Sequence, residues 1–300
     1  MKHAWSIIWK LVLILCVVGL IILAIGWAKG GFGSLTIGSG GIHAAKTHDQ
    51  HINEQSLDSF SIINVDSETM DISVVTGDHY GLKVDATNTP RTITWSNKSG
   101  TLQLQQSSAG SITVGLEKVI AVITVPSNAG LTSISVKSSA AKVSIAADCG
   151  TLTVNTSAGL IDVSGLVSGD ATITSDAGAI TVSGSIKGDA KVSSSAGAIT
   201  VTGTTGAISA STEAGMVTIT GASPSIDVHS TVGAVTVTVP GTWASTNYKL
   251  STTIGSIAAS GAGAPSQANF GTKQGGPSTG YDLLLKIDTT VGAITVDLGD

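Results

Sequence analysis

The sequence has few charged residues, few aromatic residues and almost no cysteine. Charged residues make up 12% of its 300 positions and aromatic residues 4%, whereas globular domains usually carry roughly 25% charged residues. Large side chains are too scarce to fill a wide core, so we expect a narrow core of Val, Ile, Leu and Ala. Cys16 lies in an apolar terminal segment and Cys149 far along the chain, which excludes a disulfide framework.

Basic residues are also scarce. The chain has a single arginine, Arg91, no basic cluster, and a formal net charge of -5 at pH 7. This balance argues against nucleic acid and anionic lipid as partners of the region that follows the apolar segment.

One long apolar run stands near the N-terminus. Residues 11–28 contain no charged side chain, and Lys10 and Lys29 bracket them. About 20 apolar residues span a bilayer as a helix, so we predict a transmembrane anchor over residues 1–28 that contacts the lipid bilayer through residues 7–28. A cleaved signal peptide remains an alternative, because small residues precede Lys29 at the positions that a signal peptidase requires.

The flanking lysines give the expected orientation. Lys2 and Lys10 lie before the apolar run and Lys29 alone lies close behind it. The positive-inside rule then places the N-terminus in the cytoplasm and the rest of the chain outside it, as a single-pass protein of the cell membrane. Residues 29–59, which are rich in Gly and include His43, His48 and His51, are interpreted as a juxtamembrane linker. Weak zinc binding or pH sensing by these histidines is the alternative, and no metal or cofactor site is predicted.

The rest of the sequence repeats itself. The motif is Ser/Thr-x-x-Gly-x-Ile/Val-x-Val, and its glycines recur 18 or 19 residues apart, with Ala141 in the glycine position of the first repeat. The five regularly spaced glycines are Gly159, Gly178, Gly197, Gly215 and Gly233. A constant period of this length is typical of solenoid proteins.

Each period contains two short runs in which apolar residues alternate with Thr or Ser, as in a strand with one buried face. Thr172, Thr174 and Thr181 are expected to point outward. The residues expected to point inward are Val154, Ile161, Val163, Ile173, Ile180, Val182, Val192, Ile199, Val201, Ile208, Val217, Ile219, Ile226, Val228, Val235 and Val237. We therefore predict an all-β fold, a β-solenoid of about ten rungs, with an antiparallel sandwich or meander as the alternative.

The predicted solenoid covers residues 60–300. Residues 60–105 are less regular and are expected to form an N-terminal cap over the first rung. Residues 261–280 contain few strand-forming residues and are expected to be a flexible insertion. The last repeat, at 293–296, runs almost to the C-terminus, which suggests an uncapped end and possible end-to-end self-association.

The repeats resemble the "putative adhesin" β-repeat family of bacterial envelope proteins. The residues that carry the resemblance are 175–182, 194–201, Val125-Pro126 and Val239-Pro240. The resemblance implies a β-helical fold and a location at the cell surface, and some relatives take part in envelope-stress systems. This chain differs in carrying Ala after several of the repeat glycines, where the family more often has Asp.

Candidate chemistry is sparse. Asp170 and Asp189 each follow a glycine and lie 19 residues apart, so they are expected on neighbouring rungs. There they could contribute to a ligand face, or each could form a corner in which its side chain bonds to its own turn. Trp243 and Tyr248 could stack on a sugar or cover the end of the apolar interior. No set of residues with catalytic spacing is recognisable.

The sequence therefore predicts a non-catalytic, membrane-anchored, extracytoplasmic protein. Its role would be surface adhesion or binding of an unknown envelope, host or protein ligand, or a part in envelope stress. A carbohydrate-active β-helix enzyme and a self-assembling cell-surface scaffold are the alternatives.

Overall fold

The computed structural model describes residues 35–38, 41–44, 46–107, 112–114 and 117–299. The predicted membrane anchor, residues 1–28, lies outside the described residues. Within these ranges no helix is both long and apolar enough to cross a membrane. The described chain consists of β-strands and one short 3₁₀ helix, η1 (Trp243–Ser245).

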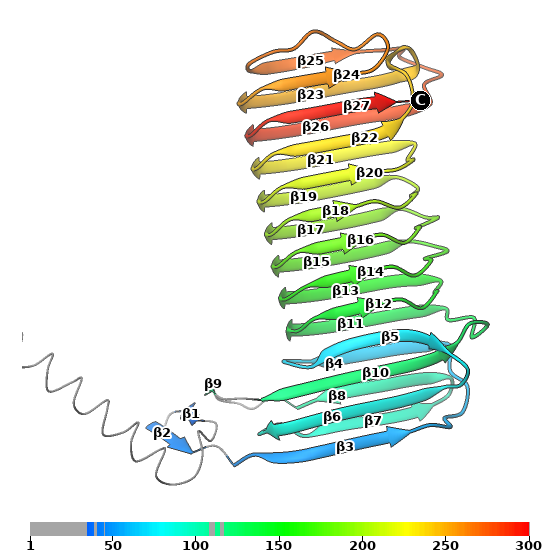
Figure 1. The fold of residues 1–300 in the computed structure, drawn as a ribbon, viewed down its shortest axis with the longest axis vertical. Helices are drawn as coiled ribbons and strands as arrows, with labels where there is room; N and C mark the ends of the chain where they lie inside the picture. Colours follow the sequence, from blue (N-terminus) through cyan, green and yellow to red (C-terminus); the bar gives the residue numbers. More distant parts are fainter. Residues whose placement is uncertain (1–34, 39–40, 45, 108–111, 115–116, 300) are drawn as a thin grey trace, which may run out of the picture.

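Two twelve-stranded sheets face each other along a rod (Figure 1). In spatial order, sheet 1 contains β24 (Ile257–Ser260), β27 (Ile294–Gly299), β22 (Val235–Pro240), β20 (Val217–Thr220), β18 (Ile199–Val201), β16 (Ile180–Val182), β14 (Ile161–Val163), β12 (Val143–Ile145), β5 (Asp71–Gly77), β10 (Lys118–Pro126), β6 (Gly81–Thr89) and β3 (His48–Glu54). Sheet 2 contains β25 (Gly271–Gly275), β23 (Thr246–Ile254), β26 (Leu283–Val291), β21 (Ser225–Val232), β19 (Ile208–Ala214), β17 (Ala190–Ala196), β15 (Ala171–Ala177), β13 (Thr151–Ala158), β11 (Ser133–Ala140), β4 (Ile62–Ser67), β8 (Thr101–Gln106) and β7 (Ile93–Lys98). A separate small sheet contains β2 (Gly41–Ala44), β1 (Leu35–Gly38) and β9 (Ile112–Val114).

One strand of each sheet makes a rung, as in β15 followed by β16. Neighbouring rungs pair in parallel and without slippage, so that Ile173 lies beside Val192 and Ile180 beside Ile199. Ten such strand pairs stack among the described residues, from β8 with β10 to β23 with β24. This arrangement confirms the predicted all-β solenoid and its number of rungs.

The core is the narrow aliphatic layer between the two sheets. Every residue predicted to point inward is at most 2% exposed, because alternate residues of a strand face opposite sides. The serine or threonine three residues before each repeat glycine is also buried, which the sequence analysis did not assign. In spatial order this buried ladder in sheet 2 contains Ser67, Ser138, Thr156, Ser175, Ser194, Thr212, Ser230, Thr289 and Thr252.

The N-terminal end of the rod is closed by antiparallel strands. β10 pairs in parallel with β5 but antiparallel with β6, and β3 covers the outer edge of β6. On sheet 2, β7 pairs antiparallel with β8. The linker predicted over residues 29–59 is therefore wrong for β3, whose backbone hydrogen-bonds to β6.

At the C-terminal end, the spatial order of the strands differs from their order in the sequence. The last two strands, β26 and β27, lie between the β21–β22 rung and the β23–β24 rung (Figure 1). β25 then covers the edge of β23, and Ala268 exchanges backbone hydrogen bonds with Ile257 of β24. The predicted uncapped final rung is wrong, because residues 293–296 lie inside the rod. The segment predicted as a flexible insertion, 261–280, contains β25 and covers this end.

Candidate ligand-binding surfaces

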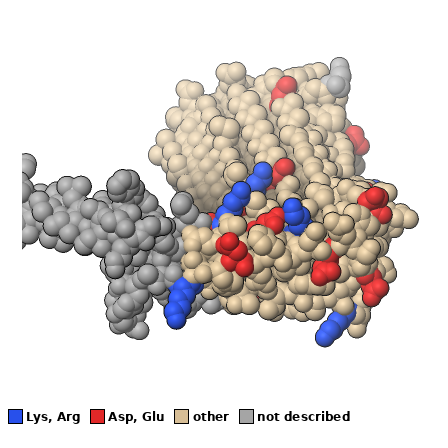
Figure 2. Space-filling view, turned by 60° about the horizontal axis from the view of Figure 1, so that its bottom comes forward, with Lys and Arg blue, Asp and Glu red and all other residues tan. Residues whose placement is uncertain are grey.

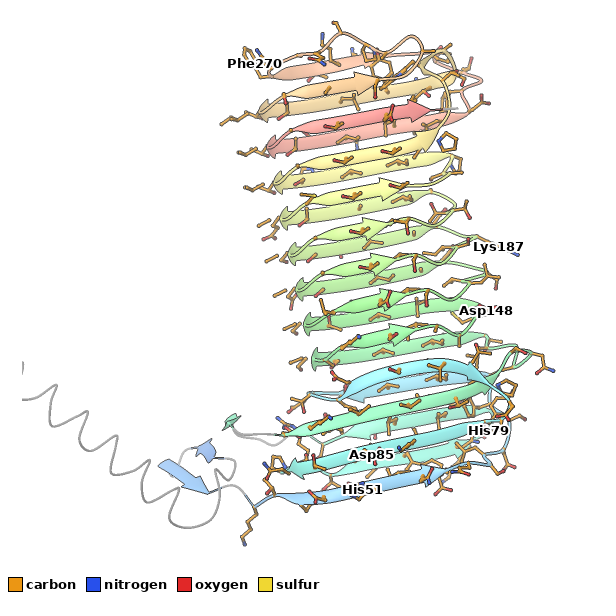
Figure 3. The ribbon with its side chains drawn as sticks, in the orientation of Figure 1. His51, His79, Asp85, Asp148, Lys187 and Phe270 are labelled. Carbon is orange, nitrogen blue, oxygen red and sulfur yellow. The ribbon has the colours of Figure 1, made fainter. Side chains whose placement is uncertain are left out.

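Asp170 and Asp189 lie at the edge of the rod where sheet 1 strands turn into the next sheet 2 strand. Asp170 Oδ1 accepts a hydrogen bond from the Asp189 N–H at 2.9 Å, and Asp189 Oδ1 accepts one from the Ala207 N–H at 3.1 Å. Asp148, labelled on the same edge in Figure 3, accepts a bond from the Leu166 N–H in the same way. Each carboxylate thus braces the corner of the next rung, rather than its own turn as expected.

Replacing Asp170 by alanine is expected to lower the free energy of unfolding by about 1 kcal/mol, because the Asp189 N–H loses its partner at an exposed corner. Hydrogen–deuterium exchange should show faster exchange at Asp189 and at the start of β17. Asp162→Ala, which changes an outward carboxylate in β14 without removing such a bond, is the matched control. Equal effects of the two changes would contradict the bracing role.

Trp243 and Tyr248 lie together at the C-terminal end. Their rings meet edge to face with centroids 5.0 Å apart, and Trp243 Nε1–H donates a hydrogen bond to the Ser260 carbonyl at 2.7 Å. Trp243 is buried, and Tyr248 takes the in-register place that Leu285 and Ile226 hold in the rungs below. The two rings therefore cover the end of the aliphatic interior.

The structure does not bring the aspartates Asp170 and Asp189 into one site with the aromatic residues Trp243 and Tyr248. Strands β19, β21 and β26 separate β17, which follows Asp189, from β23, which contains Tyr248. At about 4.8 Å per strand, the pairs are roughly 20 Å apart along the rod. Asp170 and Asp189 therefore do not form one ligand face with Trp243 and Tyr248.

Histidine and carboxylate side chains meet in pairs at the N-terminal end. His51 Nδ1 is 3.1 Å from Asp85 Oδ1, and Lys83 Nζ is 3.1 Å from Asp85 Oδ2 (Figure 3). Hydrogen bonds from Lys83 and then His51 lower the pKa of Asp85. In the parts of the chain that the structure describes, no three His, Cys, Asp or Glu side chains are grouped to hold a metal ion. Figure 2 shows this end, where charged side chains of both signs are scattered among uncharged ones.

Two shallow cavities lie along the Asp edge. The first, of about 300 Å³, is bounded by the turn at 126–130 and by Leu166, and Cys149 lies at its floor. Burial, followed by the negative charge of Asp148, raises the pKa of the Cys149 thiol to about 11. The thiol is therefore protonated at neutral pH, and Cys149 packs as a small buried hydrophobe.

The second cavity, of about 400 Å³, lies where a column of buried corner residues stops. Cys149, Val167, Ile186 and Thr205 pair in parallel along this column, and the next corner contains Pro224. Proline has no N–H to continue a ladder. The buried Thr205 hydroxyl has no hydrogen-bond partner among the residues that the structure describes. In the sequence, this site is marked by a change in the spacing of the repeat glycines, which shortens from 19 residues between Gly178 and Gly197 to 18 between Gly197 and Gly215.

The repeat pattern has a counterpart among known families. The sequence pattern of the Toastrack DUF4097 family matches residues 60–297. The chain belongs to this family. The resemblance of the repeats to the "putative adhesin" β-repeat family is confirmed by this match and by the solved structures below. The predicted N-terminal anchor lies outside the matched residues. No functionally curated protein matches the Toastrack chain.

Several solved structures are similar to the Toastrack chain at low identity. A "putative adhesin" from Bacteroides fragilis is 15% identical with a TM-score of 0.49, over 84% of this chain and 98% of that chain. A "putative cell adhesion protein" from Clostridium sporogenes is 15% identical with a TM-score of 0.31, over 85% of this chain and 100% of that chain. A "putative adhesin" from Parabacteroides merdae is 13% identical with a TM-score of 0.29, over 85% and 97% of the two chains.

Proposed function

We propose that this Toastrack protein is a single-pass membrane protein whose rod lies outside the cytoplasm and acts by binding rather than by catalysis. The apolar run at residues 11–28, with its flanking lysines, supports the anchor and its orientation. The adhesin names of the similar solved structures are consistent with a binding role.

The observation that carries the binding role is an exposed apolar edge. This edge, here called the glycine edge, follows the corners formed by the repeat glycines. Its exposed large side chains are Leu160, Met216, Val232, Val291 and Ile254, and Phe270 extends it at the C-terminal end (Figure 3). Ile254 is 63% exposed and Phe270 74%. Apolar side chains gathered along one edge of a soluble domain are typical of an interaction surface.

Two measurements on the full chain test the proposal. Protease added to intact cells should degrade the rod. In cells not treated with protease, the full chain should stay with the membrane fraction after an alkaline wash. Ile254→Glu and Phe270→Glu should reduce the capture of envelope or host components, whereas Lys187→Glu on the opposite edge should not. Protection of the rod inside intact cells would overturn the orientation, and equal capture by all variants would overturn the role of the glycine edge.

A further inference from the structure

The outer face of sheet 1 carries a regular grid of hydroxyl groups. In each of four successive rungs, one hydroxyl residue lies outward on the strand and a second follows two positions later. The four pairs are Thr181 with Ser183, Thr200 with Thr202, Thr218 with Thr220, and Thr236 with Thr238. We call these eight residues the hydroxyl grid.

The two columns of the grid are in register. Thr181, Thr200, Thr218 and Thr236 lie side by side on consecutive parallel strands, and Thr295 continues their column. In the second column, the N–H groups of Ser183 and Thr202 each bond a carbonyl of the preceding rung at 2.8 Å, and Thr220 pairs with Thr238. Hydroxyls therefore repeat about 4.8 Å apart along the rod and about 6.7 Å apart along each strand.

The scaffold beneath the grid is rigid. Each first-column threonine stands between two residues that are buried in the core, as Thr181 stands between Ile180 and Val182, both 0% exposed. Every strand of the grid is hydrogen-bonded on both sides. The hydroxyl positions are thus fixed by the core before any ligand arrives, which removes most of the ordering cost of binding.

The threonine hydroxyls of the grid face solvent. They make no hydrogen bond to another described residue, whereas hydroxyls elsewhere on the rod bond to one another. On the outer face of sheet 2, for example, Ser193 Oγ donates to Thr174 Oγ1 at 3.2 Å. The seven threonine hydroxyls of the grid are therefore without a partner among the described residues, whereas Ser183 Oγ donates to the Val163 carbonyl at 3.5 Å.

The grid is also uncharged, unlike the opposite face of the same rungs. Asp162 and Asp297 adjoin its ends, and no charged or aromatic residue interrupts the eight positions. The outer face of sheet 2 carries Lys191 and the ion pair of Lys286 with Asp227, whose Nζ and Oδ2 atoms are 3.0 Å apart. The grid therefore suits an uncharged ligand, and it offers no ring on which a sugar could stack.

From these features we infer that the hydroxyl grid binds the surface of ice, a rigid and uncharged lattice of water. A single hydroxyl–water bond adds only about 1 kcal/mol because liquid water offers the same bond. A fixed grid makes many such bonds at once with a rigid lattice. The inference concerns the face of sheet 1 and does not depend on the anchor or on the glycine edge.

Ice affinity of the full chain tests the inference. The chain, in detergent micelles at low concentration, is mixed with a similarly sized detergent-solubilised protein, and ice is grown slowly from the solution. The wild-type chain should be enriched in the ice several-fold over that reference protein. The double variant Thr218→Lys/Thr236→Lys should remain in the liquid, because two charged side chains stand above the grid and hold mobile water.

The matched control is Ser209→Lys/Ser211→Lys in β19, which forms one rung with β20. These serines are exposed on the outer face of sheet 2, so the control adds the same charge to the opposite face and should be enriched like wild type. Circular dichroism must show the same β-sheet signal for all three chains. Exclusion of the wild-type chain from ice, or equal loss of enrichment in both double variants, would overturn the inference. Either result leaves the proposed anchor and binding role untouched, since protease and capture measurements test those.

Discussion

Replacing Gly178 by alanine is expected to lower the free energy of unfolding by about 4 kcal/mol, combining backbone strain with overpacking. A Cβ atom at this position would lie 1.8 Å from the Gly159 carbonyl oxygen, which belongs to the backbone of the neighbouring rung. The φ angle of Gly178 is +150°, a conformation that residues with a Cβ rarely adopt. Thermal unfolding followed by circular dichroism should therefore show a markedly lower midpoint.

Gly130 provides the matched control for this prediction. Its φ angle is +60°, and a Cβ there would meet nothing within 4 Å. Gly130→Ala should therefore cost only about 1 kcal/mol, the usual penalty of a left-handed residue. If the two variants have the same thermal unfolding midpoint, the rungs can move apart at the corner. Close stacking would then not be the reason why glycine recurs at this period.

The stacking of one corner on the next also bears on the one repeat that has alanine, Ala141, in place of glycine. The motif glycines from Gly159 onward each face a carbonyl oxygen of the preceding motif corner. Ala141 opens the series, and below it lies Glu68, whose carbonyl accepts a hydrogen bond from the Ala140 N–H at 2.6 Å. The corner below Ala141 is therefore the β4–β5 turn rather than a repeat glycine.

Local alternation was sufficient to predict the core. Inward and outward positions follow from the two-residue period of a strand, which needs no knowledge of the partner strand. The same parity places Thr212 inside with Ala210 and Ile208, so the buried ladder was available to sequence reasoning but was missed because its members are polar. Within this ladder, Thr252 Oγ1 donates to the Gly292 carbonyl at 3.0 Å. The buried hydroxyls of Thr212, Ser230 and Thr289 have no partner among the described residues.

The order of the last rungs could not be predicted in this way. The rungs containing Gly255 and Gly292 carry the same motif, so either could stack on the rung of Gly233. The deciding feature is Tyr248, which occupies an inward column otherwise filled by aliphatic residues such as Ile226 and Leu285. A tyrosine ring would overfill that narrow interior between two rungs, but it covers the interior well at the end of the rod.

The hydrogen-bond partners of Asp170 and Asp189 could not be predicted either, because these bonds join different rungs.

The sole arginine holds together the N-terminal end of the rod, and its removal is the second change with a large expected effect. Arg91 Nε–H donates to Glu68 Oε2 at 2.9 Å, and Nη1–H donates to Glu117 Oε2. The Thr89 hydroxyl donates to Glu117 Oε1 at 2.6 Å. The Arg91 side chain is 8% exposed and that of Glu117 12%, so the network joins the β4–β5 turn, the β6–β7 turn and the start of β10 away from water.

Arg91→Ala should lower the free energy of unfolding by about 4 kcal/mol, because it leaves the Glu117 carboxylate buried without a cation. Hydrogen–deuterium exchange should locate the loss in β6 and β10, because solenoid rungs open locally. Adding Glu117→Gln should recover more than about 1 kcal/mol, the coupling expected for contacting groups. As a control, Lys286→Ala removes the exposed ion pair with Asp227 and should cost no more than about 1 kcal/mol. A cost for Arg91→Ala as small as this would mean that water reaches Glu117, and that packing of β3, β6 and β7 alone closes the end of the rod.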